Sequence, residues 1–252
     1  MAADARRFSV VLVGIVAILR PLLRLLTRRD WRGAQNLPGG GFVLAANHLS
    51  HVDPLLVSHF LVNHDIPPRF LGKASLFNVP ILRSILRVTG QIPVDRGTAD
   101  ASKAFTAAVE AVSEGACVIV YPEGTLTRDP QLWPMTGRTG AARIALATDR
   151  PVIPLAQWGA QAILPPYAKR PSLWPRKPVH VWVGEPVDLS DFEHLPPTLE
   201  LLYEATDRIM AAITELEESI RGEVAPKERF DPRKNGTAET GDPDKPRRTG
   251  HD

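Results

Sequence analysis

The chain has 252 residues, 44% of them hydrophobic, and a formal net charge of +2. This length and composition fit one sizeable domain with a full hydrophobic core. So small a charge, with no basic stripe interleaved with aromatic residues, gives no reason to expect nucleic acid as a partner. The single cysteine, Cys117, excludes an internal disulfide; it lies in an apolar run, where we expect it to be buried, and a reducing location fits.

Residues 8–26 form an apolar segment with arginines on both sides. Its uninterrupted part ends at Leu19, because Arg20 and Pro21 follow, whereas a spanning helix needs about 20 apolar residues. No small-residue cleavage site marks it as a signal peptide. We expect residues 1–29 to form a membrane-anchoring helix in the interface, with arginines reaching anionic headgroups. A helix packed on the domain's own surface and a true single span are the alternatives.

A polar octapeptide, Asn47–Pro54, separates two apolar runs. Residues 42–46 are short enough for a buried strand, and the apolar residues from Leu55 onward have the pattern of a helix face. In open α/β sheets, ligands bind where a strand gives way to a helix. Pro54 suits the first turn of that helix, and Asp53 is well placed to cap it.

His48 and Asp53 are the candidate catalytic residues in this octapeptide. A histidine can turn one ring nitrogen toward the carboxylate and the other toward a substrate, which is the base-and-orienter half of a catalytic triad. The chain has no serine in a Gly-x-Ser-x-Gly turn, so a substrate hydroxyl is the expected nucleophile. The alternative is that Asp53 only caps a helix and His48 is an ordinary loop residue.

A zinc site is a competing interpretation of the histidines. His48, His51 and Asp53 are all zinc-ligand types. However, His59 and His64 fall on different faces of a helix, and no cysteine joins the group. We therefore expect no metal.

The rest of the chain alternates between strand-like and helix-like segments, which predicts an α/β layered domain over residues 30–222. From residue 223 the chain is charged, carries Pro and Gly and is almost without apolar residues, so we expect a disordered tail over 223–252. Further strands are expected at residues 69–72, 91–94, 116–120, 152–156 and 179–183, and helices at 81–88, 101–112, 140–148 and 199–220.

Two further polar stretches follow expected strands. Arg96 follows the strand 91–94 after one residue, Asp95, and an arginine there can fork two hydrogen bonds to phosphate oxygens. Glu123 and Thr125 follow the strand 116–120 and can hydrogen-bond a polyol phosphate, while Gly124 lets the backbone approach a ligand. The alternatives are a surface arginine and a plain turn.

Four motifs in order resemble those of the glycerolipid acyltransferases, the 1-acyl-sn-glycerol-3-phosphate acyltransferases being the most similar type. The similarity covers roughly residues 31–190. It implies a mixed sheet flanked by helices and the transfer of a fatty acyl group from acyl-CoA or acyl carrier protein to the free hydroxyl of lysophosphatidate, giving phosphatidate. The motifs are Asn47-His48-x-x-x-x-Asp53-Pro54, Val94-Asp95-Arg96, Tyr121-Pro122-Glu123-Gly124-Thr125 and Val152-Ile153-Pro154-Leu155.

The resemblance also implies roles for individual residues. Arg96 is expected to bind the acceptor's phosphate and Lys73 to be a second phosphate ligand, although a solvated lysine is the alternative for Lys73. Glu123, Gly124 and Thr125 are expected to hold the glycerol phosphate. No redox cofactor or metal is required, and the enzyme is expected at the cytoplasmic face of a membrane containing anionic lipid.

One position departs from the family pattern. Leu126 stands where the family often has arginine, and Arg128, two residues on, is a candidate substitute. This keeps open an acyltransferase for another acceptor, such as a glycolipid or an acylated amino acid. A lipid-binding protein without turnover is a third alternative, against which the intact His48 and Asp53 argue. The loop 170–177 is either a second membrane contact or solvated.

Overall fold

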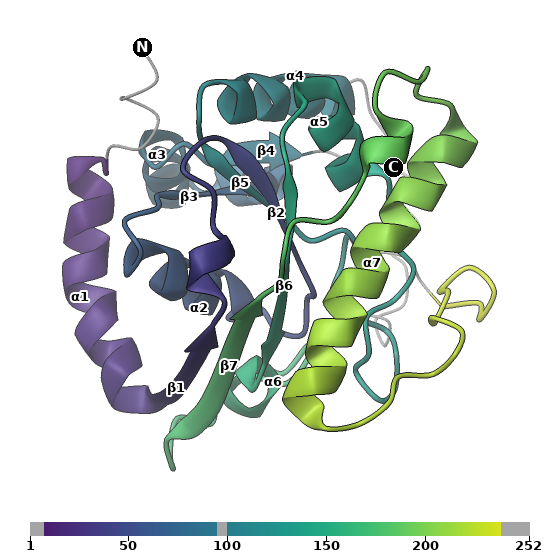
Figure 1. Cartoon of the computed structure of the whole chain (residues 1–252). Coiled ribbons are helices and arrows are strands. Elements are labelled where there is room, and N and C mark those ends of the chain that lie inside the picture. The colour runs from purple at the N-terminus through teal and green to yellow at the C-terminus, as the bar shows by residue number, and fades with distance from the viewer. Residues whose placement is uncertain (1–7, 95–99, 238–252) are drawn as a thin grey trace, which may run out of the picture.

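A computed structural model describes residues 8–94 and 100–237 of the chain. In these residues seven strands form one sheet in the order β1-β7-β6-β2-β5-β3-β4 (Figure 1). Neighbouring strands are parallel, except that β6 and β7 are antiparallel, so the sheet is mixed, as expected. The strands are β1 (Thr27–Arg32), β2 (Phe42–Ala46), β3 (Pro68–Lys73), β4 (Ile92–Val94), β5 (Cys117–Val120), β6 (Val152–Trp158) and β7 (Lys177–Val183).

The helices confirm the predicted alternation. Each strand and helix expected between residues 42 and 220 is present, and its ends differ from the prediction by no more than two residues. The four-residue helix α6 and the strand β1 were not expected. The helices are α1 (Val10–Leu26), α2 (Asp53–Val62), α3 (Pro80–Val88), α4 (Asp100–Ser113), α5 (Gly140–Thr148), α6 (Ala160–Ile163) and α7 (Leu199–Arg221).

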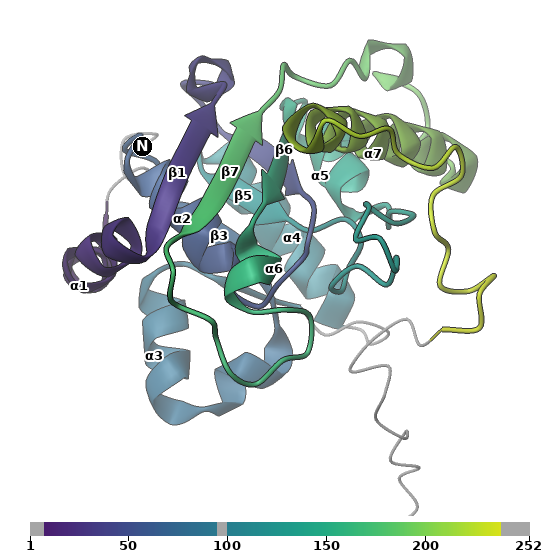
Figure 2. The ribbon, with the colours of Figure 1, turned by 90° about the horizontal axis from the view of Figure 1, so that it is seen from below.

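Side chains of the central strand β2 alternate between two hydrophobic clusters, one on each face of the sheet. Val43 and Ala45 pack with α4, α5 and α7, whereas Phe42, Leu44 and Ala46 pack with α2. Figure 2 shows α2 on one side of the sheet and α4, α5 and α7 on the other. Because both faces are covered, all five residues of β2 are buried, which explains their continuous apolar run. Cys117 is buried in the cluster on the α2 side, as predicted.

Strand β1 moves the start of the domain from residue 30 to Thr27. Its sequence, Thr-Arg-Arg-Asp-Trp-Arg, has no apolar alternation, so no strand was predicted. Its pairing with β7 is supported by side chains: Asp30 lies 2.9 Å from His180 Nδ1 and accepts a hydrogen bond from Trp182 Nε1 at 3.1 Å. The guanidinium of Arg32 lies over the Trp182 ring, 4.0 Å from its centroid. Polar and cation–π contacts with β7 therefore support the strand, in addition to Trp31, which packs against the hydrophobic cluster on the α2 side.

Helix α1 packs against α2 and β1 by one side only. The Arg20 guanidinium donates to Asn63 Oδ1 at 2.6 Å, and Leu12 is the buried residue of the helix. Several large apolar side chains on its other side are exposed, and Figure 1 shows α1 at the margin of the molecule. Among the described residues, no helix combines the length and the hydropathy that crossing a bilayer requires.

The expectation of a disordered tail from residue 223 is wrong for residues 223–237. Ala225 N–H donates to Glu218 Oε1 at 2.7 Å, and Arg229 forms an ion pair with Asp207 at 3.1 Å. Further on, the Phe230 carbonyl accepts from Thr136 N–H at 3.0 Å. Hydrogen bonds and ion pairs hold this segment, so its lack of apolar residues misled the prediction. The remainder of the tail, 238–252, lies outside the described residues.

A prediction about stability follows from the glycines before β2. A Cβ added at Gly41 would lie 1.9 Å from the Val112 carbonyl oxygen at the end of α4, whereas one added at Gly39 meets nothing within 4 Å. Gly41→Ala should therefore lower the free energy of unfolding by about 1–3 kcal/mol, or roughly 2–4 °C in Tm for each kcal/mol. Thermal melts of both alanine variants are the test. Equal melting temperatures for Gly41→Ala and Gly39→Ala would contradict the close packing of α4.

Candidate active site

The octapeptide 47–54 lies at the carboxyl end of the parallel part of the sheet. It joins β2 to α2, and the turn 121–125 follows β5, the neighbour of β2. Lys73 ends β3, the next strand along. Because parallel strands end at the same edge, the fold brings together segments that are far apart in sequence. Arg96, after β4, falls in the 95–99 stretch outside the described residues.

His48 and Asp53 form a close pair at this edge. His48 Nδ1 lies 2.8 Å from Asp53 Oδ2, and the Asp53 side chain is fully buried. An ionised carboxylate only accepts hydrogen bonds, so Nδ1 carries the proton that points at Asp53. In the neutral ring, Nε2 is then left with a lone pair that can take a proton from a substrate.

Asp53 does not cap α2, which corrects that part of the sequence analysis. Val52 occupies the cap position, and no side chain bonds the first turn. Asp53 Oδ2 instead accepts from two backbone groups before the helix, Leu49 N–H at 2.6 Å and Ser50 N–H at 2.8 Å. One carboxylate oxygen therefore fixes the loop and the His48 ring together.

The ring of Tyr121 fixes the plane of His48. The two rings stack with centroids 4.1 Å apart and an angle of 16° between their planes, and Phe70 continues the stack behind Tyr121. The Tyr121 hydroxyl is buried, and burial raises the pKa of Tyr121 well above its usual value. Tyr121 thus presents a neutral aromatic face to the histidine. The sequence placed it in a motif without giving it a role.

Glu123 holds the backbone of His48. Its Oε1 accepts from His48 N–H at 2.9 Å, and its Oε2 accepts from Met135 N–H at 3.1 Å. The His48 carbonyl accepts from Thr127 N–H at 2.8 Å, so both backbone groups of the histidine are bonded to the segment after β5. Burial raises the pKa of Glu123 to about 8, with Glu217 and Asp53 contributing in the same direction.

Asn47 connects the loop to α7. Its Nδ2 donates to Glu217 Oε2 at 2.7 Å and to the Gln157 carbonyl at 3.0 Å, while its Oδ1 accepts from Gln157 N–H at 2.8 Å. Glu217 is fully buried and pairs with Arg221 at 3.2 Å. The Arg221 guanidinium lies between two indole rings, those of Trp133 at 3.6 Å and Trp158 at 4.3 Å.

Sequence reasoning missed Glu217, although a signal was present. Ile209, Ile213 and Glu217 succeed one another at intervals of four, so they lie on one face of α7. The first two are buried core residues. A carboxylate on that stripe needs a buried partner, because an isolated buried charge is costly.

Comparisons with known proteins show which family the chain belongs to. A family model described as Acyltransferase matches residues 28–158. The chain belongs to the acyltransferase family. The resemblance seen in the four motifs is thereby confirmed.

Relatives of this acyltransferase carry more specific names. A 1-acyl-sn-glycerol-3-phosphate acyltransferase of Bacillus subtilis is 30% identical over 74% of this chain and 86% of its own length. The protein of the same name from Escherichia coli is 29% identical over 46% of each chain. A crystal structure of the 1-acyl-sn-glycerophosphate acyltransferase PlsC from Thermotoga maritima matches with a TM-score of 0.62 and 22% identity, over 85% of this chain and 82% of that one, which shows that the fold is shared.

The third motif of the acyltransferase makes a tight turn at Gly124. Gly124 has φ +79°, a left-handed conformation that favours glycine, and its N–H donates to the Tyr121 carbonyl at 3.0 Å. Thr125 follows, half-buried, beside Glu123. Lys73, the other expected phosphate ligand, is exposed at the end of β3.

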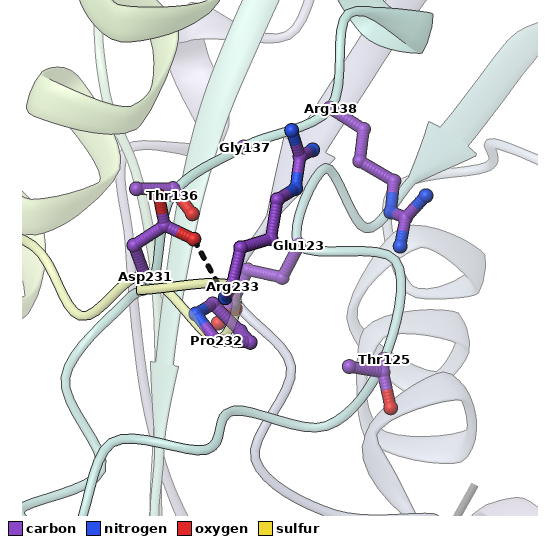
Figure 3. Close-up of a pocket in the computed structure, with 8 residues that line it drawn as sticks. All are labelled: Glu123, Thr125, Thr136, Gly137, Arg138, Asp231, Pro232 and Arg233. Atoms are coloured by element: carbon purple, nitrogen blue, oxygen red, sulfur yellow. Dashed lines mark hydrogen bonds between the residues drawn. The ribbon is translucent and has the colours of Figure 1, made fainter. Parts of the chain in front are cut away.

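Leu126 and Arg128 lie in different environments. Leu126 is buried, so it serves packing. Arg128 is largely buried, its guanidinium 4.9 Å from the centre of the Tyr167 ring, and the ring edge of His51 meets the same tyrosine at 6.2 Å. Arg128 thus lies beside Tyr167, in the loop that connects α6 to β7, and does not line the pocket formed by Thr125 with residues 136–138 and 231–233 (Figure 3).

The remaining histidines among the described residues do not form a metal centre. His59 is buried edge-on against Trp31, with ring centroids 5.0 Å apart. Burial, with nearby Arg29, Arg24 and Arg20, lowers the pKa of His59 to about 4, so it is neutral near pH 7. Within residues 8–94 and 100–237, no three His, Cys, Asp or Glu side chains gather as metal ligands would.

The pKa of Glu123 leads to a prediction about pH. A carboxyl whose pKa rises from 4.5 to about 8 on folding binds its proton more tightly in the native state. Its contribution to stability is therefore fully present below about pH 4.5 and is lost as the pH rises through about 8. We expect the free energy of unfolding to fall between about pH 5 and pH 9, and to fall less in Glu123→Gln. Denaturant unfolding at several pH values measures this. The exposed Glu193 offers a control, since Glu193→Gln should leave the slope as in the parent protein.

Proposed function

We propose that this chain is a 1-acyl-sn-glycerol-3-phosphate acyltransferase, which moves a fatty acyl group from acyl-CoA or acyl carrier protein to the free hydroxyl of lysophosphatidate and yields phosphatidate. The observation that carries the proposal is the His48–Asp53 pair at the sheet edge, with Nδ1 held by a buried carboxylate and Nε2 left as the base. The name and near-complete coverage of the Bacillus subtilis relative support the choice of acceptor.

The mechanism needs no nucleophile from the protein. His48 Nε2 takes the proton of the acceptor hydroxyl, and the hydroxyl oxygen attacks the thioester carbonyl carbon. Asp53 stabilises the imidazolium that forms and keeps the ring in place. The tetrahedral intermediate then breaks its C–S bond, and His48 returns the proton to the departing thiolate. A new C–O ester bond and a free thiol are the products.

The acceptor would be held at the same edge of the sheet. We propose that Arg96 and Lys73 bind its phosphate, and that Gly124 and Thr125 contact its glycerol phosphate. Glu123 was expected from the sequence to hold the glycerol phosphate directly. We propose a different role for it, because each of its oxygens already accepts a backbone N–H. It positions His48 and forms part of the wall of the acceptor site.

A second candidate is an acyltransferase of the same mechanism with another lipid acceptor. The buried Leu126 favours it, since the residue at this position cannot reach a phosphate. Assays of the purified protein with a panel of lysophospholipid, glycolipid and acyl-amino-acid acceptors, with products identified by mass, separate the two.

We further propose that α1 attaches the enzyme to the cytoplasmic surface of a membrane with anionic lipid. Val10, Ile18 and Leu25 are 88%, 72% and 64% exposed, and their spacing places them on one face of the helix. Helix α3 has no buried residue and exposes Ile81 and Val88 on one face. Apolar side chains of this kind, with flanking arginines, suit the interface between headgroups and acyl chains.

Removing the proposed base tests the mechanism. His48→Ala and Asp53→Asn should each lower kcat by about 10²–10⁴, because a positioned general base contributes that much. Circular dichroism and thermal melts establish that the variants are folded. His51→Ala, in the same loop but outside the pair, should retain activity within a few-fold of the parent protein. A folded His48→Ala enzyme with undiminished turnover would exclude the mechanism.

Replacing the exposed residues of α1 tests the membrane attachment. The triple change of Val10, Ile18 and Leu25 to Gln leaves the packed side of the helix intact, and should reduce partitioning onto anionic vesicles by roughly tenfold or more. Residual binding of the parent protein should weaken with salt. The same change at three exposed residues far from α1, Leu195, Leu199 and Val224, is the control. If co-sedimentation is equal for both variants, attachment resides in another surface, and the loop with the exposed Trp174 is the next to test.

A further inference from the structure

The carboxyl-terminal end of α7 lies outside the four motifs and yet is bonded to the loop that carries His48. Glu217 and Arg221 are one helical turn apart there, and Glu217 Oε1 accepts from Arg221 Nη1 at 3.2 Å. The other carboxyl oxygen, Oε2, accepts from Asn47 Nδ2 at 2.7 Å. Asn47 directly precedes His48, so this end of the helix is connected to the residue before the proposed base.

A second connection leads from Arg221 to the backbone of His48 itself. The Arg221 guanidinium lies over the Trp133 indole, 3.6 Å from the ring centroid. The Trp133 carbonyl accepts from Thr127 Oγ1 at 2.7 Å, and Thr127 N–H donates to the His48 carbonyl at 2.8 Å. The contacts therefore form a closed ring with two arms, one through Glu217 and one through Trp133, which meet at Arg221.

Arg221 is itself fixed on several sides, and its side chain is only 8% exposed. A second indole, that of Trp158, lies 4.3 Å from the guanidinium. Glu223 Oε2 accepts from Arg221 Nη2 at 2.7 Å, and the Gln131 carbonyl accepts from Nη1 at 3.1 Å. A planar guanidinium can stack between two rings and donate from its edge at the same time, which a lysine ammonium group cannot.

The arm through Glu217 depends on the charge of Arg221. Glu217 is fully buried, and burial raises its pKa to about 8, against the hydrogen bond and the charge of Arg221, which lower it. Without the guanidinium, one buried oxygen of Glu217 would lose its donor and the carboxyl would bind a proton more tightly. A protonated carboxyl is a weaker acceptor for Asn47 than a carboxylate.

We propose that Arg221 is a positioning residue for His48, which it fixes through both arms of this ring. The inference rests on the proposed function, since His48 acts there as the base. A base displaced by about 1 Å from the geometry of the reaction can cost 10²-fold in rate. Arg221 thus acts on the reaction from outside the four motifs and without contact with the substrate.

The main variant is full-length Arg221→Met, which removes the guanidinium and keeps an unbranched side chain between the two indoles. Arg221→Lys keeps the charge without the planar fork. Arg208→Met is the matched control, because Arg208 pairs with Asp191 at 2.8 Å and lies 4.4 Å from the Phe192 ring centroid. It removes an ion pair and a cation–π contact about 20 Å further along the same helix.

We expect Arg221→Met to lower kcat by about 10–100-fold, with both KM values within a few-fold of the parent protein. Arg221→Lys should fall between the two, and Arg208→Met should keep its kcat within a few-fold. Kinetics with lysophosphatidate and acyl-CoA are measured at a temperature at which circular dichroism shows every variant to be folded. An undiminished kcat in folded Arg221→Met would overturn the inference. If Arg221→Met does not fold, Arg221→Lys carries the same test.

Two combined variants distinguish positioning from general support of the fold. In a His48→Ala background, Arg221→Met should cause no further loss of residual activity, because no base remains to be displaced. A loss as large as in the parent protein would overturn the inference. Glu217→Gln combined with Arg221→Met leaves no buried carboxyl without its cation and keeps an amide oxygen for Asn47, so its kcat should exceed that of Arg221→Met several-fold. A double variant no faster than Arg221→Met would also overturn it.

NMR provides a measurement that does not depend on turnover. The proton on His48 Nδ1, which lies 2.8 Å from Asp53 Oδ2, is assigned by its loss in His48→Ala. We expect its resonance to shift or broaden in Arg221→Met and to stay unchanged in Arg208→Met. A resonance unaffected by Arg221→Met would overturn the inference. The proposed function can fail separately: a parent protein whose His48 resonance responds to Arg221, but which does not acylate lysophosphatidate, would keep the positioning role and refute the acceptor.

Discussion

Three buried carboxyl groups from different parts of the fold fix the loop that carries His48. Asp53 at the start of α2 accepts from the His48 ring and from two backbone N–H groups, Glu123 after β5 accepts the His48 N–H, and Glu217 on α7 accepts from Asn47. Hydrogen bonds offset the cost of burying a carboxyl group, so each of these groups favours one arrangement of the donors that it accepts from. These bonds connect the loop to three separate elements. They thereby fix the direction in which the His48 Nε2 atom points.

The three acids differ in their surroundings. Asp53 accepts three hydrogen bonds through a single oxygen, one from the His48 ring and two from backbone N–H groups. Burial, with nearby Glu217 and Asp53, raises the pKa of Glu123 to about 8, and the two backbone N–H groups that it accepts from offset this only in part. Glu217 has Arg221 as a partner, which is itself sandwiched by tryptophans. The three carboxyl groups therefore differ in their partners: Asp53 bonds to the His48 ring, Glu123 to the backbone of His48, and Glu217 to Asn47 and Arg221.

Local patterns predicted most of the fold, because its strands and helices follow apolar periodicity. They predicted the pairing of His48 with Asp53 as well, because the two residues are close in sequence. What they could not predict depends on contacts between distant residues. Strand β1 is stabilised by Asp30 and Arg32 pairing with residues 150 positions away, the tail is held by hydrogen bonds and ion pairs, and Asp53 gives up its expected capping role for the His48 loop. Polar contacts of this kind leave no periodic signal in a single sequence.

The bond between Asn47 and Glu217 spans 170 residues, and this has a consequence for synthesis. At about 5–20 residues per second, roughly 10–30 s separate the appearance of these two residues on the ribosome. During that interval α1 and the first strands exist without the helix that completes the His48 loop. The chain therefore makes α1 first and the α7 residue that holds Asn47 last. Stalled or C-terminally truncated products lack the bond between Asn47 and Glu217, which connects the His48 loop to α7.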